Sequence, residues 1–146
     1  MKGKTIIPRR DFFRTTGVLG TSILLPRQVM AALSKIKRPI KIGMIADLHQ
    51  DVMHDGPARL KAFLDAMKEE KPDALLQLGD FAYPSKKNEV VTKAFENAHS
   101  KALHVLGNHE IDGGHSFEQV AKLWGMKGRY YTENVNGLEL IVLDCN

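Results

Sequence analysis

One stretch decides the fold of this chain: Ala102-Leu-His-Val-Leu-Gly-Asn-His-Glu110. Its first five residues form a short, mostly apolar run, and polar side chains follow directly. A continuous apolar run of this length is typical of a strand buried on both faces of a parallel sheet. We therefore predict a strand over residues 102–106 that ends in a loop carrying Asn108, His109 and Glu110.

Two earlier stretches have the same design. An apolar run at residues 41–46 is followed by Asp47 and His49, and a second run at residues 73–78 is followed by Asp80. Open α/β sheets place their ligand sites at the carboxyl ends of the strands. We therefore expect the side chains at these three strand ends to share one site.

Helical patterns lie between and after the predicted strands. The first helix is predicted to begin at Asp55-Gly56-Pro57, with Asp55 as its N-cap, and to end near Glu70. A second helix is predicted over residues 89–100. Its apolar face is expected to comprise Val90, Val91, Ala94, Phe95 and Ala98. A third, short helix is predicted over residues 116–124, with Ser116 as its N-cap.

The end of the chain has a different period. Asn136-Gly137 separates two runs, residues 130–135 and residues 138–143. This dipeptide is a strong signal for a tight β-hairpin, because both of its residues tolerate positive φ. Strands that alternate with helices indicate an α/β fold with an at least partly parallel sheet.

The positive charge of the chain is concentrated at its N-terminus. Residues 1–38 contain nine Lys and Arg and one Asp, whereas residues 39–146 contain twelve Lys and Arg and sixteen Asp and Glu. The mildly acidic second part argues against a general nucleic-acid-binding surface, so no nucleic-acid partner is expected. Cys145 is the single cysteine, which excludes an intrachain disulfide and a cysteine-based zinc site.

Residues 1–38 have the layout of a secretory signal and linker. Arg9-Arg10 precedes two aromatic residues, and an uncharged stretch at residues 15–26 is far shorter than the ~20 apolar residues of a membrane-spanning helix. The pair and the weakly apolar stretch together resemble a bacterial twin-arginine translocation signal. The resemblance implies recognition by the twin-arginine machinery, export to the periplasm or medium, and no stable membrane span. A basic tail and a retained N-terminal anchor remain as alternatives.

The polar residues at the strand ends have the chemistry of a metal site. Asp47 and His49 lie two residues apart, so both can face one cation if the chain bends there. Asp80 has two oxygens that can bridge two cations, and Asn108 offers a neutral oxygen. Mixed oxygen and nitrogen ligands suit Mn, Fe, Zn or Co. His109 is suited to donating a proton near neutral pH.

Together, Asp47-x-His49, Gly79-Asp80 and Gly107–Glu110 resemble the first three motifs of the calcineurin-like metallophosphoesterases. The resemblance covers about residues 40–146 and implies a mixed β-sandwich flanked by helices. It also implies metal-dependent hydrolysis of phosphate mono- or diesters, with a small-molecule phosphoester as substrate.

The resemblance further implies a role for each residue of a dinuclear centre. Asp47 and His49 would bind the first divalent ion, Asp80 would bridge both ions, and Asn108 would bind the second. His109 would be the catalytic acid or a phosphate contact. Tyr83 completes a Gly-Asp-x-x-Tyr pattern found in purple acid phosphatases, but with His49 present we expect it to be a packing or pocket residue.

The sequence also departs from the family pattern. The family supplies further histidine ligands from later motifs, whereas no histidine follows His115 in this sequence. We therefore expect residues 39–146 to be the N-terminal part of the phosphoesterase domain, a truncated fragment that binds metal weakly and turns over phosphoesters poorly. The alternative is a non-catalytic exported domain that binds metal or phosphate. A nuclease is disfavoured by the acidic charge of this part.

Overall fold

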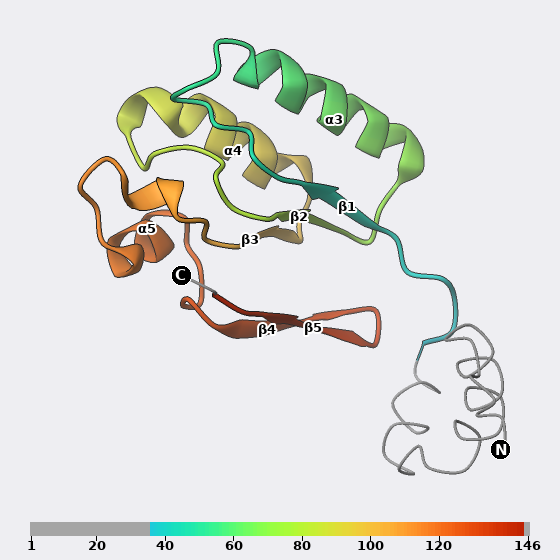
Figure 1. Ribbon diagram of the computed structural model, residues 1–146. Helices are drawn as coiled ribbons and strands as arrows, with labels where there is room; N and C mark the ends of the chain where they lie inside the picture. The colour runs from blue at the N-terminus through green and yellow to red at the C-terminus, as the bar shows by residue number, and fades with distance from the viewer. Residues whose placement is uncertain (1–35, 145–146) are drawn as a thin grey trace, which may run out of the picture. The chain divides into compact units, whose positions relative to one another are not determined.

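The structure, a computed structural model, describes residues 36–144 (Figure 1). The expected signal and linker, residues 1–38, therefore lie almost wholly outside the described residues. Export stays a prediction, which N-terminal sequencing of the exported protein can check. Within the described range, no helix combines the length and the apolar character needed to cross a bilayer.

A parallel three-stranded sheet forms the centre of the fold. Its strands are β1 (Ile42–Ile45), β2 (Ala74–Gln77) and β3 (Ala102–His104), in the order β1-β2-β3. Ile42 pairs with Ala74, and Leu75 pairs with Ala102. Because all three strands run in one direction, their carboxyl ends lie at the same edge of the sheet, as predicted.

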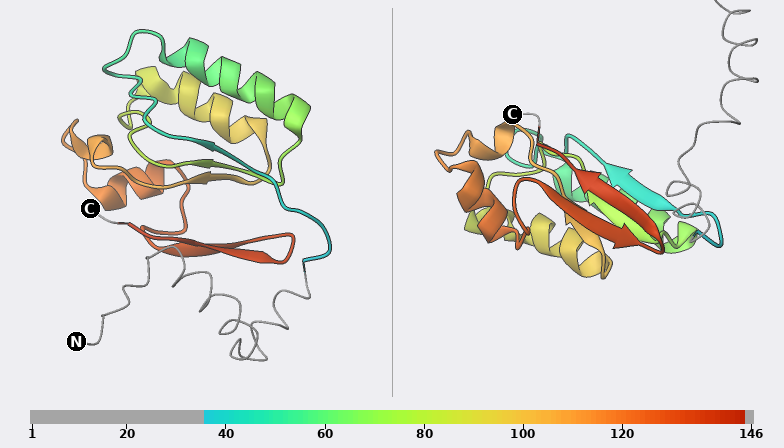
Figure 2. Two further views of the ribbon diagram at one scale, coloured as in Figure 1. Left: turned by 45° about the vertical axis from the view of Figure 1, so that its right-hand side comes forward. Right: turned by 90° about the horizontal axis from the view of Figure 1, so that it is seen from below.

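Two helices cover one face of this sheet (Figures 1 and 2). They are α3 (Gly56–Glu70) and α4 (Glu89–Ala98). Helix α3 ends at Glu70, because the C-cap residue Lys71 has a left-handed conformation that stops the helix. Asp55 is the N-cap residue of α3, as predicted, but its side chain makes no capping hydrogen bond. Its carboxylate accepts a hydrogen bond of 2.9 Å from Arg59 Nε instead of one from a backbone N–H group of the first turn.

The hydrophobic core lies between these helices and the sheet. Leu60, Leu75 and Phe95 are buried there. The rings of Phe81 and Phe95 lie 5.5 Å apart, and Trp124 lies edge-on to Phe81 at 6.5 Å. Phe81 comes directly after Asp80, so the core fixes the start of a candidate site loop.

The predicted apolar face of α4 is only partly buried. Val91 and Phe95 are in the core, whereas Val90 is 64% exposed. Ala94 and Ala98 are also exposed. These three residues line a groove between α3 and α4 rather than the sheet face. A helical repeat identifies the apolar side of a helix, but it does not show how much of that side the neighbouring elements bury.

The remaining described elements are short 3-10 helices, one further α-helix and a β-hairpin. Short 3-10 helices span Lys86–Asn88 and His109–Ile111. Helix α5 (Phe117–Leu123) begins with a capping box, in which Ser116 and Gln119 satisfy each other's backbone N–H groups. The predicted hairpin consists of β4 (Tyr131–Val135) and β5 (Leu138–Val142).

The hairpin lies against the face of the sheet opposite the helices (Figures 1 and 2). Tyr131 Oη donates a 2.7 Å hydrogen bond to the carbonyl of His104 in β3. Asn136 and Gly137 have φ values of 51° and 95°, as expected for the tight turn. The described residues thus form a mixed α/β fold with a parallel sheet, which confirms the predicted class.

The buried side chain of His104 should make the stability of the fold depend on pH. Its imidazole is buried, and burial lowers its pKa from 6.5 to about 4. Between these two values the unfolded chain binds a proton that the folded chain excludes, so stability falls as the pH is lowered. Over this range, wild-type unfolding free energy should fall by roughly 3 kcal/mol more than that of His104→Gln. Urea unfolding from pH 7 to pH 4 measures this, and equal pH dependence of the two proteins would contradict it.

Candidate metal centre

The loops that follow β1 and β2 are held together by their backbones. The ladder between the strands continues beyond their ends, with Asp47 N donating to Gly79 O at 3.2 Å and His49 N donating to Asp80 O at 2.8 Å. Leu48, between the two polar residues, is buried in the core. The loop is therefore anchored by an apolar side chain while its two flanking residues stay at the edge of the sheet.

Three of the predicted site residues have an unusual backbone conformation. Asp47, His49 and Asp80 have φ values of 53°, 46° and 52°. This left-handed region is uncommon for residues other than glycine and costs about 1–3 kcal/mol per residue. Such strain persists only where the surrounding structure imposes it, and it occurs most often at functional sites.

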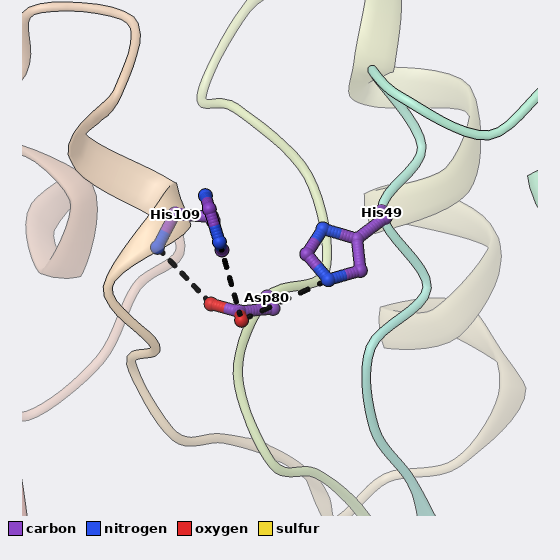
Figure 3. A group of neighbouring side chains, drawn as sticks. All are labelled: His49, Asp80 and His109. Carbon is purple, nitrogen blue, oxygen red and sulfur yellow. Dashed lines mark hydrogen bonds and ion pairs between the residues drawn. The ribbon is translucent and has the colours of Figure 1, made fainter.

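The side chains of these loops converge on Asp80. Figure 3 shows the imidazoles of His49 and His109 on either side of its carboxylate. The Nε2 atoms of His49 and His109 lie 3.8 Å and 4.0 Å from Asp80 Oδ2. Asp47 Oδ1 lies 3.7 Å from the same His49 nitrogen. These separations are too long for hydrogen bonds.

The same separations fit ligands of one cation. Metal bonds to nitrogen and oxygen measure ~2.0–2.2 Å, so two ligands of one ion lie at most ~4.4 Å apart. All three measured separations are below this limit. His49, Asp80 and His109 form the metal-type cluster identified among residues 36–144. The imidazole and carboxylate donors suit a borderline divalent metal.

The two remaining predicted ligands lie beside this cluster. Asp47 and Asn108 are exposed, and both line a hollow of about 300 Å³ together with Asp80. Leu78 and Leu143 form part of its wall. The fold thus brings all five predicted residues to the carboxyl edge of the sheet, with the Asp80 loop in the middle.

A comparison with known families agrees with this arrangement. The family model described as calcineurin-like phosphoesterase matches residues 40–145. The chain belongs to this family. The resemblance inferred from the three motifs is therefore confirmed. Among the curated proteins, none matches the sequence.

His109 has a defined orientation in this phosphoesterase domain. Its backbone N–H donates to Asp80 Oδ1 at 3.0 Å, and its Nδ1 lies 2.5 Å from Asp112 Oδ2. The hydrogen bond with Asp112 raises the pKa of His109 above its ordinary value. Asp112 was not among the site residues predicted from the sequence. The three-residue spacing on a helical turn was the available signal for this pair.

Glu110 joins the second and third loops of the phosphoesterase domain. Its side chain is fully buried, and its two oxygens accept hydrogen bonds from Phe81 N at 2.6 Å and Gly107 N at 2.8 Å. Burial raises the pKa of Glu110, and the backbone donors partly oppose this effect. Glu110 therefore supports the site by binding the backbones of both loops.

Gln77 holds together the ends of two strands that precede the site loops. Its buried side chain accepts a hydrogen bond from Gly79 N at 2.7 Å and donates one to Val105 O at 2.9 Å. It thereby connects the ends of β2 and β3, where the loops with Asp80 and Asn108 begin. Its role could not be predicted from the sequence, because a polar residue within an apolar run does not reveal its hydrogen-bond partners.

Proposed function

We propose that this domain hydrolyses phosphate esters with divalent metal ions. The proposal rests on the convergence of His49 and His109 on Asp80 in a chain of the phosphoesterase family, with His49 Nε2 and Asp80 Oδ2 3.8 Å apart and so within the reach of one cation. Asp47 and His49 would hold a first ion, Asp80 would bridge, and Asn108 would hold a second. Mn, Fe, Zn and Co suit this donor set.

The residues of the chain would bind and orient the phosphoester. Bound divalent ions supply Lewis acidity and neutralise the charge that develops on the phosphoryl group. The hollow beside Asp47 and Asn108 is open to a small-molecule substrate. Its volume of about 300 Å³ is at the lower end of the range for small-molecule sites.

We propose His109 as the proton donor to the leaving oxygen. Asp112 contacts Nδ1 and holds the ring, which leaves Nε2 for the substrate. The side chain is partly exposed, so a substrate can reach it. Nε2 cannot carry a proton and bind a metal ion at the same time, so this role excludes His109 from the ligand set during proton transfer.

A metal titration tests the proposed function. The full chain is stripped of metal and assayed with 4-nitrophenyl phosphate and bis(4-nitrophenyl) phosphate after addition of Mn²⁺, Co²⁺ or Zn²⁺. We expect slow hydrolysis that requires metal and stops when a chelator is added. Hydrolysis that is indifferent to metal would contradict the proposal.

A second function is binding of metal or phosphate without turnover. It is favoured by the small number of imidazoles that reach Asp80, which are His49 and His109 among the described residues. Tight metal binding with no hydrolysis of either ester would support this function and exclude the enzymatic one.

A further inference from the structure

We propose that Asp51 is a positioning residue of the metal centre. It would hold the loop that carries His49 against the loop that carries Asp80. The inference rests on the proposed metal-dependent function, because it concerns how two of the proposed ligands are held.

Asp51 has a buried carboxylate and lies in the loop between β1 and α3. Its side chain is 5% exposed. Oδ2 accepts a hydrogen bond from the backbone N–H of Tyr83 at 2.6 Å and another from Asn88 Nδ2 at 2.7 Å. Lys87 Nζ lies 3.1 Å from Oδ1 and balances the charge. All of these partners lie at least 32 residues away in sequence, so the contacts join two separate segments.

The position of Asp51 gives these contacts a direct effect on the ligands. It follows His49 by two residues, and Tyr83 follows Asp80 by three. Between them, the backbone bond from His49 N to Asp80 O measures 2.8 Å, and that from Gln50 N to Phe81 O measures 3.1 Å. The hydrogen bond from Tyr83 N to Asp51 Oδ2 lies at the end of this paired segment that is farther from the strands.

The strained backbone explains why such a contact is needed. His49 and Asp80 both have left-handed φ values, and both therefore gain from relaxing if the loops separate. Relaxation of either residue would change the 3.8 Å separation between His49 Nε2 and Asp80 Oδ2. The buried Asp51 carboxylate opposes separation of the two loops, because it is bonded to Tyr83 N and Asn88 Nδ2 in the segment that follows Asp80.

The Asp80 loop is held from its other side in the same way. Phe81 N donates to Glu110, which belongs to the third loop, and Tyr83 N donates to Asp51, which belongs to the first. Alternate backbone N–H groups of the central loop thus bond to carboxylates from its two neighbours. Asp51 is the member of this pair that acts on the His49 side.

Asp73 provides a matched control at the opposite edge of the sheet. Its side chain is 7% exposed and, like Asp51, accepts hydrogen bonds from a backbone N–H, that of Lys41 at 2.9 Å, and from an amide, Asn136 Nδ2 at 2.6 Å. It also pairs with Arg38. Asp73 precedes β2, whereas the ligands follow the strands. Its loss should weaken the fold without moving the ligands.

Cobalt binding to the full chain tests the inference. Metal-free wild type, Asp51→Asn and Asp73→Asn are titrated with Co²⁺, and affinity is measured by calorimetry and ligand geometry by visible absorption. Asp51→Asn should bind Co²⁺ ~10–100-fold more weakly, with an altered spectrum. Asp73→Asn should keep the affinity and spectrum of wild type. If Asp51→Asn does not fold, Asn88→Ala is titrated instead and should show the same changes in smaller measure.

The outcomes separate this inference from the proposed function. Wild-type affinity and spectrum in Asp51→Asn, or in Asn88→Ala where that variant replaces it, would overturn the positioning role. An equal loss of affinity in Asp73→Asn would also overturn it, because the effect would then come from general stability. If wild type itself shows no Co²⁺ spectrum that depends on His49, as tested with His49→Ala, the proposed metal centre fails instead.

Discussion

Replacing Asp80 with asparagine should weaken metal binding more than ~100-fold while leaving the fold intact. Asp80 is the residue on which the site converges, with the Nε2 atoms of His49 and His109 at 3.8 Å and 4.0 Å from Oδ2. Asparagine has nearly the same shape and tolerates the left-handed φ of 52° at this position. The substitution therefore removes one negative charge and one acceptor oxygen without changing the backbone.

The expected loss is large because the proposed function makes Asp80 the ligand shared by both ions. Loss of an outer partner of a metal site already costs ~10–100-fold in affinity, so loss of Asp80 should cost more than ~100-fold. Hydrolysis of 4-nitrophenyl phosphate should fall to the level without metal. Asp65→Asn is the matched control, because Asp65 lies in α3 and pairs with Lys61 and Lys68. Unchanged Mn²⁺ affinity in Asp80→Asn would refute the assignment of the site.

Replacing Gly107 with alanine should damage both the site and the fold. A Cβ atom at position 107 would lie 2.2 Å from Asp80 Oδ1 and 2.5 Å from Asp80 N. It would also lie 2.9 Å from Glu110 Oε2. A backbone nitrogen cannot move without the loop that carries it, so Asp80 and its neighbours must shift. Overpacking of this kind typically costs about 1–3 kcal/mol.

Gly113 provides the control for this substitution. A Cβ atom there would lie no closer than 3.6 Å to the nearest side chain, His115, which is an ordinary contact. Urea unfolding and Mn²⁺ titration of Gly107→Ala and Gly113→Ala should therefore differ. We expect loss of stability and of metal affinity in the first variant and little change in the second. Equal behaviour would show that the second and third loops are not in close contact.

Much of the fold could be predicted because its signals are local. The three apolar runs, the Asn136-Gly137 turn and the Ser116 capping box each depend on residues close together in sequence. The convergence of the three loops then followed from the shared direction of parallel strands. The polar residues at the strand ends could therefore be named from sequence alone.

The supports of the site could not be predicted in the same way. Asp51 and Tyr83 are 32 residues apart, and Glu110 and Phe81 are 29 residues apart. Neither pair follows a sequence period, because each depends on how two loops pack. The left-handed backbone of His49 also results from loop packing. Positive φ is too uncommon for histidine to be predicted from the residue type.

In the proposed metal centre, His49 and Asp80 ligate one divalent ion. Anomalous diffraction from crystals of the full chain grown with Mn²⁺ tests this ligation. We expect an anomalous peak between His49 Nε2 and Asp80 Oδ2, about 2.0–2.2 Å from each atom. Well-ordered crystals with Mn²⁺ peaks elsewhere and none between these two atoms would contradict it.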